Sequence, residues 1–225
     1  MNIEVLNVKK EKKENKTKYL VLLMIAILII IVIILVSIAI NNNMKPIIYI
    51  YPIEKMDVEV KLGNPQYLSC TYPKYKNGWS VTADVDRTLV DKNTGKNLYA
   101  LYWEGKEVPK NINLKEGFCV KGKDTATFLE EKLSLLGLSD KEAEEFIIYW
   151  LPKMEENNYN YIRFETKEEQ DKSMPLEITP KPDNLIRVMM DWKGLDEKIE
   201  VQEQNLETPI REGYTVVEWG GTEIK

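Results

Sequence analysis

The chain has 225 residues, of which 44% are hydrophobic and 30% are charged, and it carries a formal net charge of −5 without a single histidine. The lack of an imidazole excludes Ser-His-Asp and Cys-His catalytic centres and histidine-based zinc or copper sites. Two cysteines are too few for a structural zinc site, so we expect neither a metal nor a cofactor. Any enzyme built on this sequence would have to use carboxylates, lysine, tyrosine or serine, or oxygen ligands to a hard cation such as calcium.

An uncharged apolar run extends from Leu20 to Ile40, and Ser37 is its only polar residue. About 21 residues, each rising roughly 1.5 Å, cross a hydrocarbon core about 30 Å thick. We therefore predict a single transmembrane helix over residues 19–40. A cleaved signal peptide is the alternative interpretation, but its apolar region is usually only about 7–15 residues long.

The charges on either side of this run predict its orientation. Lysine stays on the cytoplasmic side of a membrane. After the run only Lys45 is close, whereas six lysines precede it: Lys9, Lys10, Lys12, Lys13, Lys16 and Lys18. We predict a single-pass protein of the cell membrane, with a cytoplasmic basic head (residues 1–18) and an extracytoplasmic remainder. A regulatory or lipid-binding role for the head is the alternative to this topological one.

The predicted external part is acidic. Without the six lysines and three glutamates of the head, 25 basic and 33 acidic side chains remain, a net charge of −8. Such a surface repels nucleic acid and anionic lipid. We therefore expect no nucleic-acid partner, and only four arginines are present for bidentate recognition of anions.

Periodicity predicts one β-dominated domain over residues 45–225, because no repeat or glycine/serine linker divides it. Pro46 and Pro52 bracket a first strand at residues 47–51, and residues 57–62 alternate strictly between polar and apolar side chains. Residues 67–71 and 117–120 are also strand-like. Further strands are predicted at residues 79–85, 88–90, 98–103, 159–165, 176–179, 185–192, 199–202 and 214–219.

A helical hairpin is predicted near residues 124–151, within the β-rich sequence. Asp124 is the expected N-cap of its first helix, and Gly137 is placed to end that helix in the left-handed conformation. Ser139 and Glu142 have the spacing of a capping box at the start of the second helix. The predicted class is therefore α+β: a sheet or sandwich with an inserted αα-hairpin, behind a single transmembrane helix.

Cys70 and Cys119 both lie in the predicted external part, where an oxidising environment allows a disulfide. Closing a loop of about 50 residues would stabilise the fold by roughly 4 kcal/mol. Two buried thiols that never meet are the alternative, because both cysteines lie in apolar, strand-like stretches.

Several segments carry a family resemblance. They are residues 45–52 (KPIIYIYP), 70–73 (CTYP), 77–79 (NGW), 100–105 (ALYWEG), 149–155 (YWLPKME) and 217–223 (VEWGGTE). Together they resemble a family of bacterial membrane-anchored or secreted proteins whose external domain begins with Lys-Pro-(Ile/Val)-Ile-Tyr-x-Tyr-Pro. The resemblance implies a domain that begins near Lys45, and it brings no established activity, ligand or catalytic residue with it.

Polar side chains recur in the middle of three predicted strands. Arg163 and Glu165 share one face of their strand, Arg187 and Asp191 share one face of theirs, and Glu218 lies in the last strand. If these strands are neighbours, the five side chains form a single charged surface that could bind a ligand. The alternative is a set of weak cross-strand ion pairs on a solvated face, and we favour that alternative.

Three tryptophans stand beside carboxylates: Trp103 before Glu104, Trp192 after Asp191, and Trp219 after Glu218. An aromatic ring with a nearby acid is the arrangement that stacks on a sugar and bonds its hydroxyls. Neighbours in a strand point to opposite faces, however, so the alternative is that these rings are core residues and that the acids lie outside. We favour the core interpretation.

Two functions of different class remain open. The first is a non-enzymatic binding or structural module at the cell envelope, whose partner is an envelope glycan or an envelope protein. The second is a carboxylate-dependent hydrolase of envelope glycan, in which two of Glu104, Glu155, Asp191 and Glu218 act as acid and base about 5–10 Å apart. We favour the module, because acidic residues are abundant enough for chance pairs and no catalytic motif is present.

Overall fold

The computed structural model describes residues 23–30, 45–106 and 115–224. The chain divides into two compact units, Met1–Asn41 and Asn42–Lys225. In the first unit, residues 23–30 form a helix whose apolar side chains are exposed. No helix within the described ranges is long and apolar enough to cross a membrane. The rest of the predicted span, together with the basic head, lies outside the described residues.

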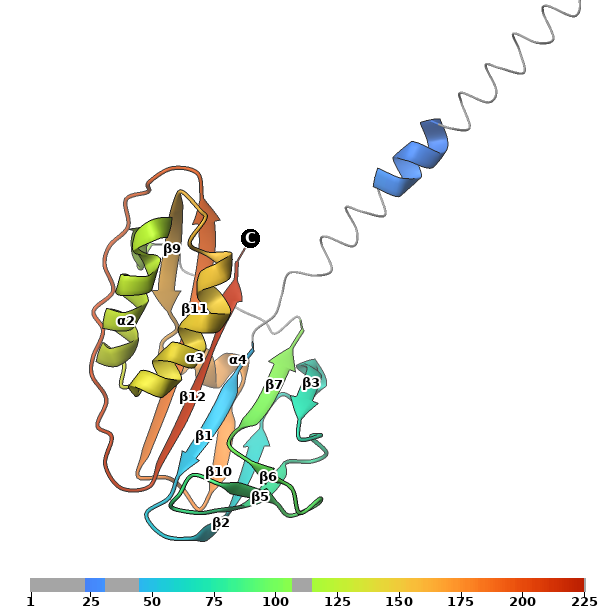
Figure 1. Ribbon diagram of the computed structural model, residues 1–225, viewed down its shortest axis with the longest axis vertical. Coiled ribbons are helices and arrows are strands. Elements are labelled where there is room, and N and C mark those ends of the chain that lie inside the picture. The colour runs from blue at the N-terminus through green and yellow to red at the C-terminus, as the bar shows by residue number, and fades with distance from the viewer. Residues whose placement is uncertain (1–22, 31–44, 107–114, 225) are drawn as a thin grey trace, which may run out of the picture. The chain divides into compact units, whose positions relative to one another are not determined.

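The second unit is a β-rich α+β domain with two sheets (Figure 1), as its periodicity predicts. The first sheet has seven strands in the order β3-β7-β1-β12-β11-β9-β8. Its strands are β3 (Leu68–Tyr72), β7 (Leu101–Gly105), β1 (Ile47–Tyr51), β12 (Thr215–Glu223), β11 (Asn184–Leu195), β9 (Tyr159–Phe164) and β8 (Phe118–Lys121). The second sheet has five strands, β10 (Leu176–Thr179), β2 (Met56–Leu62), β4 (Trp79–Ala83), β5 (Leu89–Asp91) and β6 (Asn97–Leu98), in that order.

The long strands β11 and β12 run parallel at the centre of the first sheet, and every other adjacent pair of strands in that sheet is antiparallel. Residues 196–214 connect β11 to β12. A parallel pair needs such a long crossover, because the chain must return to the starting end of the sheet. Side chains alternate between faces along each strand, so the sheet separates two cores.

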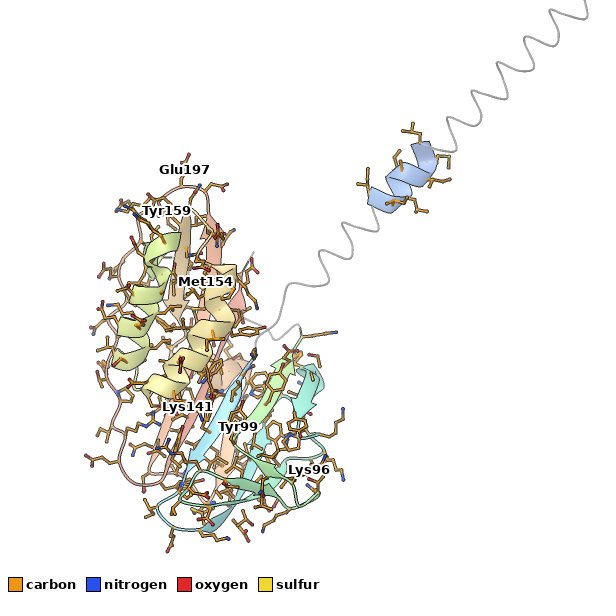
Figure 2. All side chains as sticks on the ribbon, in the orientation of Figure 1. Lys96, Tyr99, Lys141, Met154, Tyr159 and Glu197 are labelled. Carbon is orange, nitrogen blue, oxygen red and sulfur yellow. The ribbon has the colours of Figure 1, made fainter. Side chains whose placement is uncertain are left out.

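One face of the seven-stranded sheet is covered by helices α2 (Thr125–Leu135) and α3 (Asp140–Trp150), which lie over β9, β11 and β12 (Figure 1). Met154, just after this hairpin, is fully buried in that core (Figure 2). Part of the opposite face packs against the second sheet, where Val58, Val60 and Leu62 of β2 are buried as their alternation predicts. Burying these aliphatic side chains contributes roughly 1.5–3 kcal/mol each.

The helical hairpin forms where the sequence predicts it, with one difference at its start. Ser139 and Glu142 make the reciprocal capping box of α3, and Gly137 follows α2 with a φ of +85°, as expected. Asp124 makes no side-chain cap, because a short 3-10 turn, Gly122–Asp124, precedes α2. Helix α3 continues through Leu151–Lys153 as another 3-10 turn, which contains Pro152.

Three strand predictions differ from the structure. Strand β4 ends at Ala83, so Val85 is an exposed turn residue. Residues 98–103 form two strands in different sheets, β6 and β7, because the chain crosses between the sheets at residues 99–100. Residues 199–202 form no strand, although Gln202 makes an isolated bridge to Glu116.

Candidate binding site

The structure brings the predicted charged residues of β11 and β12 together but buries them. Arg187 is paired with Glu218 across the two strands, and its Nε donates to Glu218 Oε2 at 2.7 Å. Trp103 Nε1 donates to the other oxygen of Glu218 at 2.8 Å. The side chain of Glu218 is fully buried and that of Arg187 is only 5% exposed. Glu218 is therefore held by two donors and faces no solvent.

A second pair continues this network onto β9. Arg163 is paired with Asp191, and Arg163 Nη1 lies 3.2 Å from Asp191 Oδ2. Arg163 Nη2 also reaches both carboxylate oxygens of Glu169, at 2.8 and 2.9 Å. Burial opposes ionisation of Glu169, but the hydrogen bond from Arg163 outweighs it and holds the pKa of Glu169 below its usual value. Arg163 thus links two carboxylates in a protein-lined environment.

The element that covers the network is α4 (Lys167–Ser173), which the sequence analysis missed. Besides Glu169, it supplies Asp171 to Arg187 Nη1 at 3.2 Å, and Arg187 Nη2 donates to the Met174 carbonyl at 2.9 Å. The missed signal is a capping box, since Thr166 and Glu169 have the same spacing as Ser139 and Glu142 and make the same reciprocal bonds. The cross-strand ion pairs of the favoured interpretation are therefore present, but they are buried beneath α4 rather than solvated. Arg163, Asp191 and Glu218 are buried and do not line a space that could take a ligand.

The three candidate tryptophans are core residues. Trp103 and Trp219 are fully buried, and Trp192 is 2% exposed. Trp103 packs between the two sheets, whereas Trp192 and Trp219 lie under the helical hairpin. Because no ring face reaches solvent, these residues cannot stack on a sugar, and the platform interpretation is wrong for all three.

The four candidate catalytic carboxylates do not converge on a common space. Asp191 and Glu218 are buried and paired with arginines, and four strand positions, or roughly 13 Å, separate Asp191 from the position beside Glu218. Glu104 lies on β7 and faces Cys70, while Glu155 is exposed in the turn after α3. A glycosidase needs two accessible carboxyl groups within about 10 Å of each other.

The structure contradicts the disulfide, which was one of the two alternatives left open for the cysteines. Both cysteines are free thiols, with Cys70 exposed on β3 and Cys119 half-buried on β8. These strands are the two outer strands of the seven-stranded sheet, and six spacings of about 4.8 Å place them roughly 29 Å apart. A disulfide requires Cα atoms within about 7 Å of each other. The two thiols therefore cannot meet within one chain.

A further buried carboxylate, Glu142, joins α3 to the sheet and to the crossover. Arg211 donates to both of its oxygens, at 2.7 and 2.9 Å, and the Tyr51 hydroxyl donates to it as well. Burial raises the pKa of Glu142, but the hydrogen bonds from Arg211 and Tyr51 outweigh this effect and lower it below the usual value. This cluster fixes the end of the crossover and offers no free group for chemistry.

A cavity of about 740 Å³ lies beside β11, at the edge of the buried network. It is within the usual range of ligand pockets, about 300–1,000 Å³. Arg187 and Asp171 form part of its wall together with apolar side chains from several elements. The wall residues are Leu136, Glu165, Lys167, Gln170, Asp171, Leu176, Glu177, Ile178, Thr179, Lys181, Pro182, Asp183, Leu185, Ile186, Arg187, Glu207 and Pro209.

The cavity exists because β9 is shorter than β11. Strand β9 pairs with residues 190–195 of β11, and its last backbone bond runs from Glu165 N–H to the Met189 carbonyl at 2.8 Å. Below that point, no strand in the described part of the chain pairs with residues 184–188 on this side of β11. β10, the outer strand of the second sheet, also borders the cavity. A concave space with exposed strand edges is the described feature best suited to binding a partner.

Comparisons of this chain with known protein families, with curated proteins and with solved structures found no match.

Proposed function

We propose that this chain is a membrane-tethered module that acts without catalysis and binds a component of the cell envelope through the cavity beside β11. The cavity is the observation that supports this proposal, because it combines a ligand-sized volume with apolar walls and a charged rim. The apolar run at residues 20–40 and the lysines before it support the tether and its orientation.

The placement of the carboxylates favours binding over hydrolysis. Asp191 and Glu218 are each paired with an arginine in a buried network, and neither carboxylate lines the cavity where a substrate could bind. Glu104 lies on β7 of the first sheet, whereas Glu155 lies in the turn that follows the helical hairpin. The hydrolase remains the alternative function, and it would need a second carboxyl group near one of these two.

The burial of the tryptophans favours a protein partner over a glycan. The glycan hypothesis depends on an exposed aromatic ring beside an acid, and Trp103, Trp192 and Trp219 offer none. The cavity wall instead mixes leucine, isoleucine and proline with charged side chains, as protein-binding surfaces do.

Site-specific photo-crosslinking in intact cells tests the proposal. A photoreactive amino acid would replace Leu185, which is 38% exposed and lines the cavity, or Val85, which is 59% exposed on the β4–β5 turn. We expect a discrete species of higher mass from position 185 and none from the matched position 85. Equal products from both positions, or none from position 185, would contradict the proposed site.

A hydrolysis assay distinguishes the alternative function. Purified full-length protein would be incubated with isolated cell wall, and soluble glycan fragments would be measured. We expect no release above the blank. Release that disappears in Glu104→Gln or Glu155→Gln would establish the hydrolase instead.

A further inference from the structure

The open edge of β11 presents backbone hydrogen-bonding groups to the cavity. The Met189 carbonyl accepts from Glu165 N–H, and the Arg187 carbonyl accepts from Gln170 Nε2 at 3.1 Å, so odd-numbered residues of β11 point to this side. By the same alternation, the N–H and C=O of Leu185 and the N–H of Arg187 point into the cavity. An unpaired strand edge of this kind is a template for another strand.

Gln170 already imitates a neighbouring strand at this edge. Its side-chain amide donates to the carbonyl of Arg187 and also to that of Glu165, at 3.1 and 3.0 Å. It therefore links Glu165, the first residue after β9, to the Arg187 carbonyl, where the next backbone bond of a longer β9 would form. The remaining open edge, residues 184–188, is roughly 17 Å long, which corresponds to a strand of about five residues.

One side of the cavity is apolar, and charged residues surround it, while a strand presents its side chains alternately to two sides. Leu136, Ile186 and Pro209 form an apolar wall on the side of the helical hairpin. Acidic residues outnumber basic ones around the cavity, with Glu165, Asp171, Glu177, Asp183 and Glu207 against Lys167, Lys181 and Arg187. Arg187 and Asp171 pair with each other, and the remaining acidic side chains still outnumber the two lysines, so the rim favours a cationic ligand.

We propose that the cavity binds an extended peptide segment of a partner protein, which adds to β11 as an antiparallel strand in the line that β9 leaves. The backbone of the peptide bonds to Leu185 and Arg187, its apolar side chains face the helical hairpin, and its alternate side chains are basic and face the acidic rim. This inference rests on the proposed function and specifies its partner as a peptide of alternating apolar and basic residues.

Fluorescence anisotropy with a labelled peptide tests the inference. The probe is a peptide of about seven residues that alternates valine and lysine, and the protein is the full-length chain in lipid nanodiscs. Two control peptides match it: one has its amide nitrogens methylated along one edge, and the other carries glutamate in place of lysine. We expect saturable binding of the probe and binding roughly tenfold weaker for each control, because the first lacks backbone donors and the second opposes the rim.

Protein variants test the same contact from the other side. Leu185→Pro removes the N–H that points into the cavity, and proline is tolerated where that N–H faces no partner strand. We expect Leu185→Pro to weaken probe binding roughly tenfold and the matched variant Leu185→Ala, which keeps its N–H, to change it by less than about threefold. The N-methylated peptide decides the question if Leu185→Pro does not fold.

Three results would overturn the inference: no binding of the probe to the wild-type chain, equal binding of the N-methylated peptide, or full binding by a folded Leu185→Pro variant. If the probe peptide does not bind but position 185 still crosslinks in cells, strand addition is wrong and the proposed binding module stands. If the probe peptide binds the protein but position 185 forms no crosslink in cells, strand addition is supported and the proposed envelope function is contradicted.

Discussion

Replacing Arg187 by methionine should strongly destabilise the domain. The side chain of Arg187 is 5% exposed, and that of its partner Glu218 is fully buried. Arg187 Nε lies 2.7 Å from Glu218 Oε2. Methionine fills similar space but leaves the Glu218 carboxylate with the Trp103 indole as its one remaining donor among the described residues. Breaking a buried ion pair by removing one partner costs about 3–5 kcal/mol, because a charge stays buried without compensation. The loss of the bonds to Asp171 and to the Met174 carbonyl acts in the same direction.

Equilibrium urea unfolding of residues 45–225, followed by tryptophan fluorescence, measures this loss. The control is Lys55→Met, which removes a surface pair with Asp84 whose side chains are 66% and 36% exposed, and it should cost under about 1 kcal/mol. The wild-type fragment should unfold in one cooperative transition. A cost for Arg187→Met no larger than that of the control would refute the buried network, and two wild-type transitions would refute the single domain.

Three further predictions concern the tryptophans, the cysteines and Tyr214. Trp103→Ala, Trp192→Ala and Trp219→Ala should each destabilise by about 3–5 kcal/mol, and iodide should quench the native fluorescence poorly; strong quenching would show an exposed ring. Thiol titration should find two free cysteines, and in the folded protein Cys70 should react faster than Cys119. Fewer than two thiols after unfolding would indicate a disulfide. Burial raises the pKa of Tyr214 to about 12, against about 10 when unfolded, so its contribution to stability is present below pH 10 and is lost as the pH rises towards 12. Alkaline melts of Tyr214→Phe should therefore show a smaller loss of stability than the wild type, and identical pH profiles would contradict the assignment.

Local patterns were sufficient to predict much of the domain. Strict alternation in β2 identified its buried face, and the spacing of Ser139 and Glu142 located the start of α3. Alternation also placed Arg187 and Asp191 on one face of their strand, and the structure supplies the neighbouring strands that the shared charged face required. These signals depend on residues close together in the chain, which is why they can be interpreted without the fold.

The errors concern contacts between distant segments. Strand order is not encoded locally, so nothing in the sequence shows that Cys70 and Cys119 occupy opposite outer strands. Burial of Arg163 and Arg187 depends on α4, whose local sequence signal is the capping-box spacing of Thr166 and Glu169. The cavity arises from a difference in length between β9 and β11, and strand ends are the least predictable feature of a sequence.

Labelling of Cys70 in intact cells tests the central claim most directly, because an envelope partner requires the domain to lie outside the membrane. Cys70 is exposed, and in a Cys119→Ser background it is the only thiol of the chain. A membrane-impermeant maleimide should label it in intact cells. In a matched variant with both native cysteines replaced by serine, a cysteine introduced as Asn2→Cys should be labelled only after lysis. Labelling of Cys70 only after lysis, or of Asn2→Cys in intact cells, would contradict a cytoplasmic head and an external binding domain.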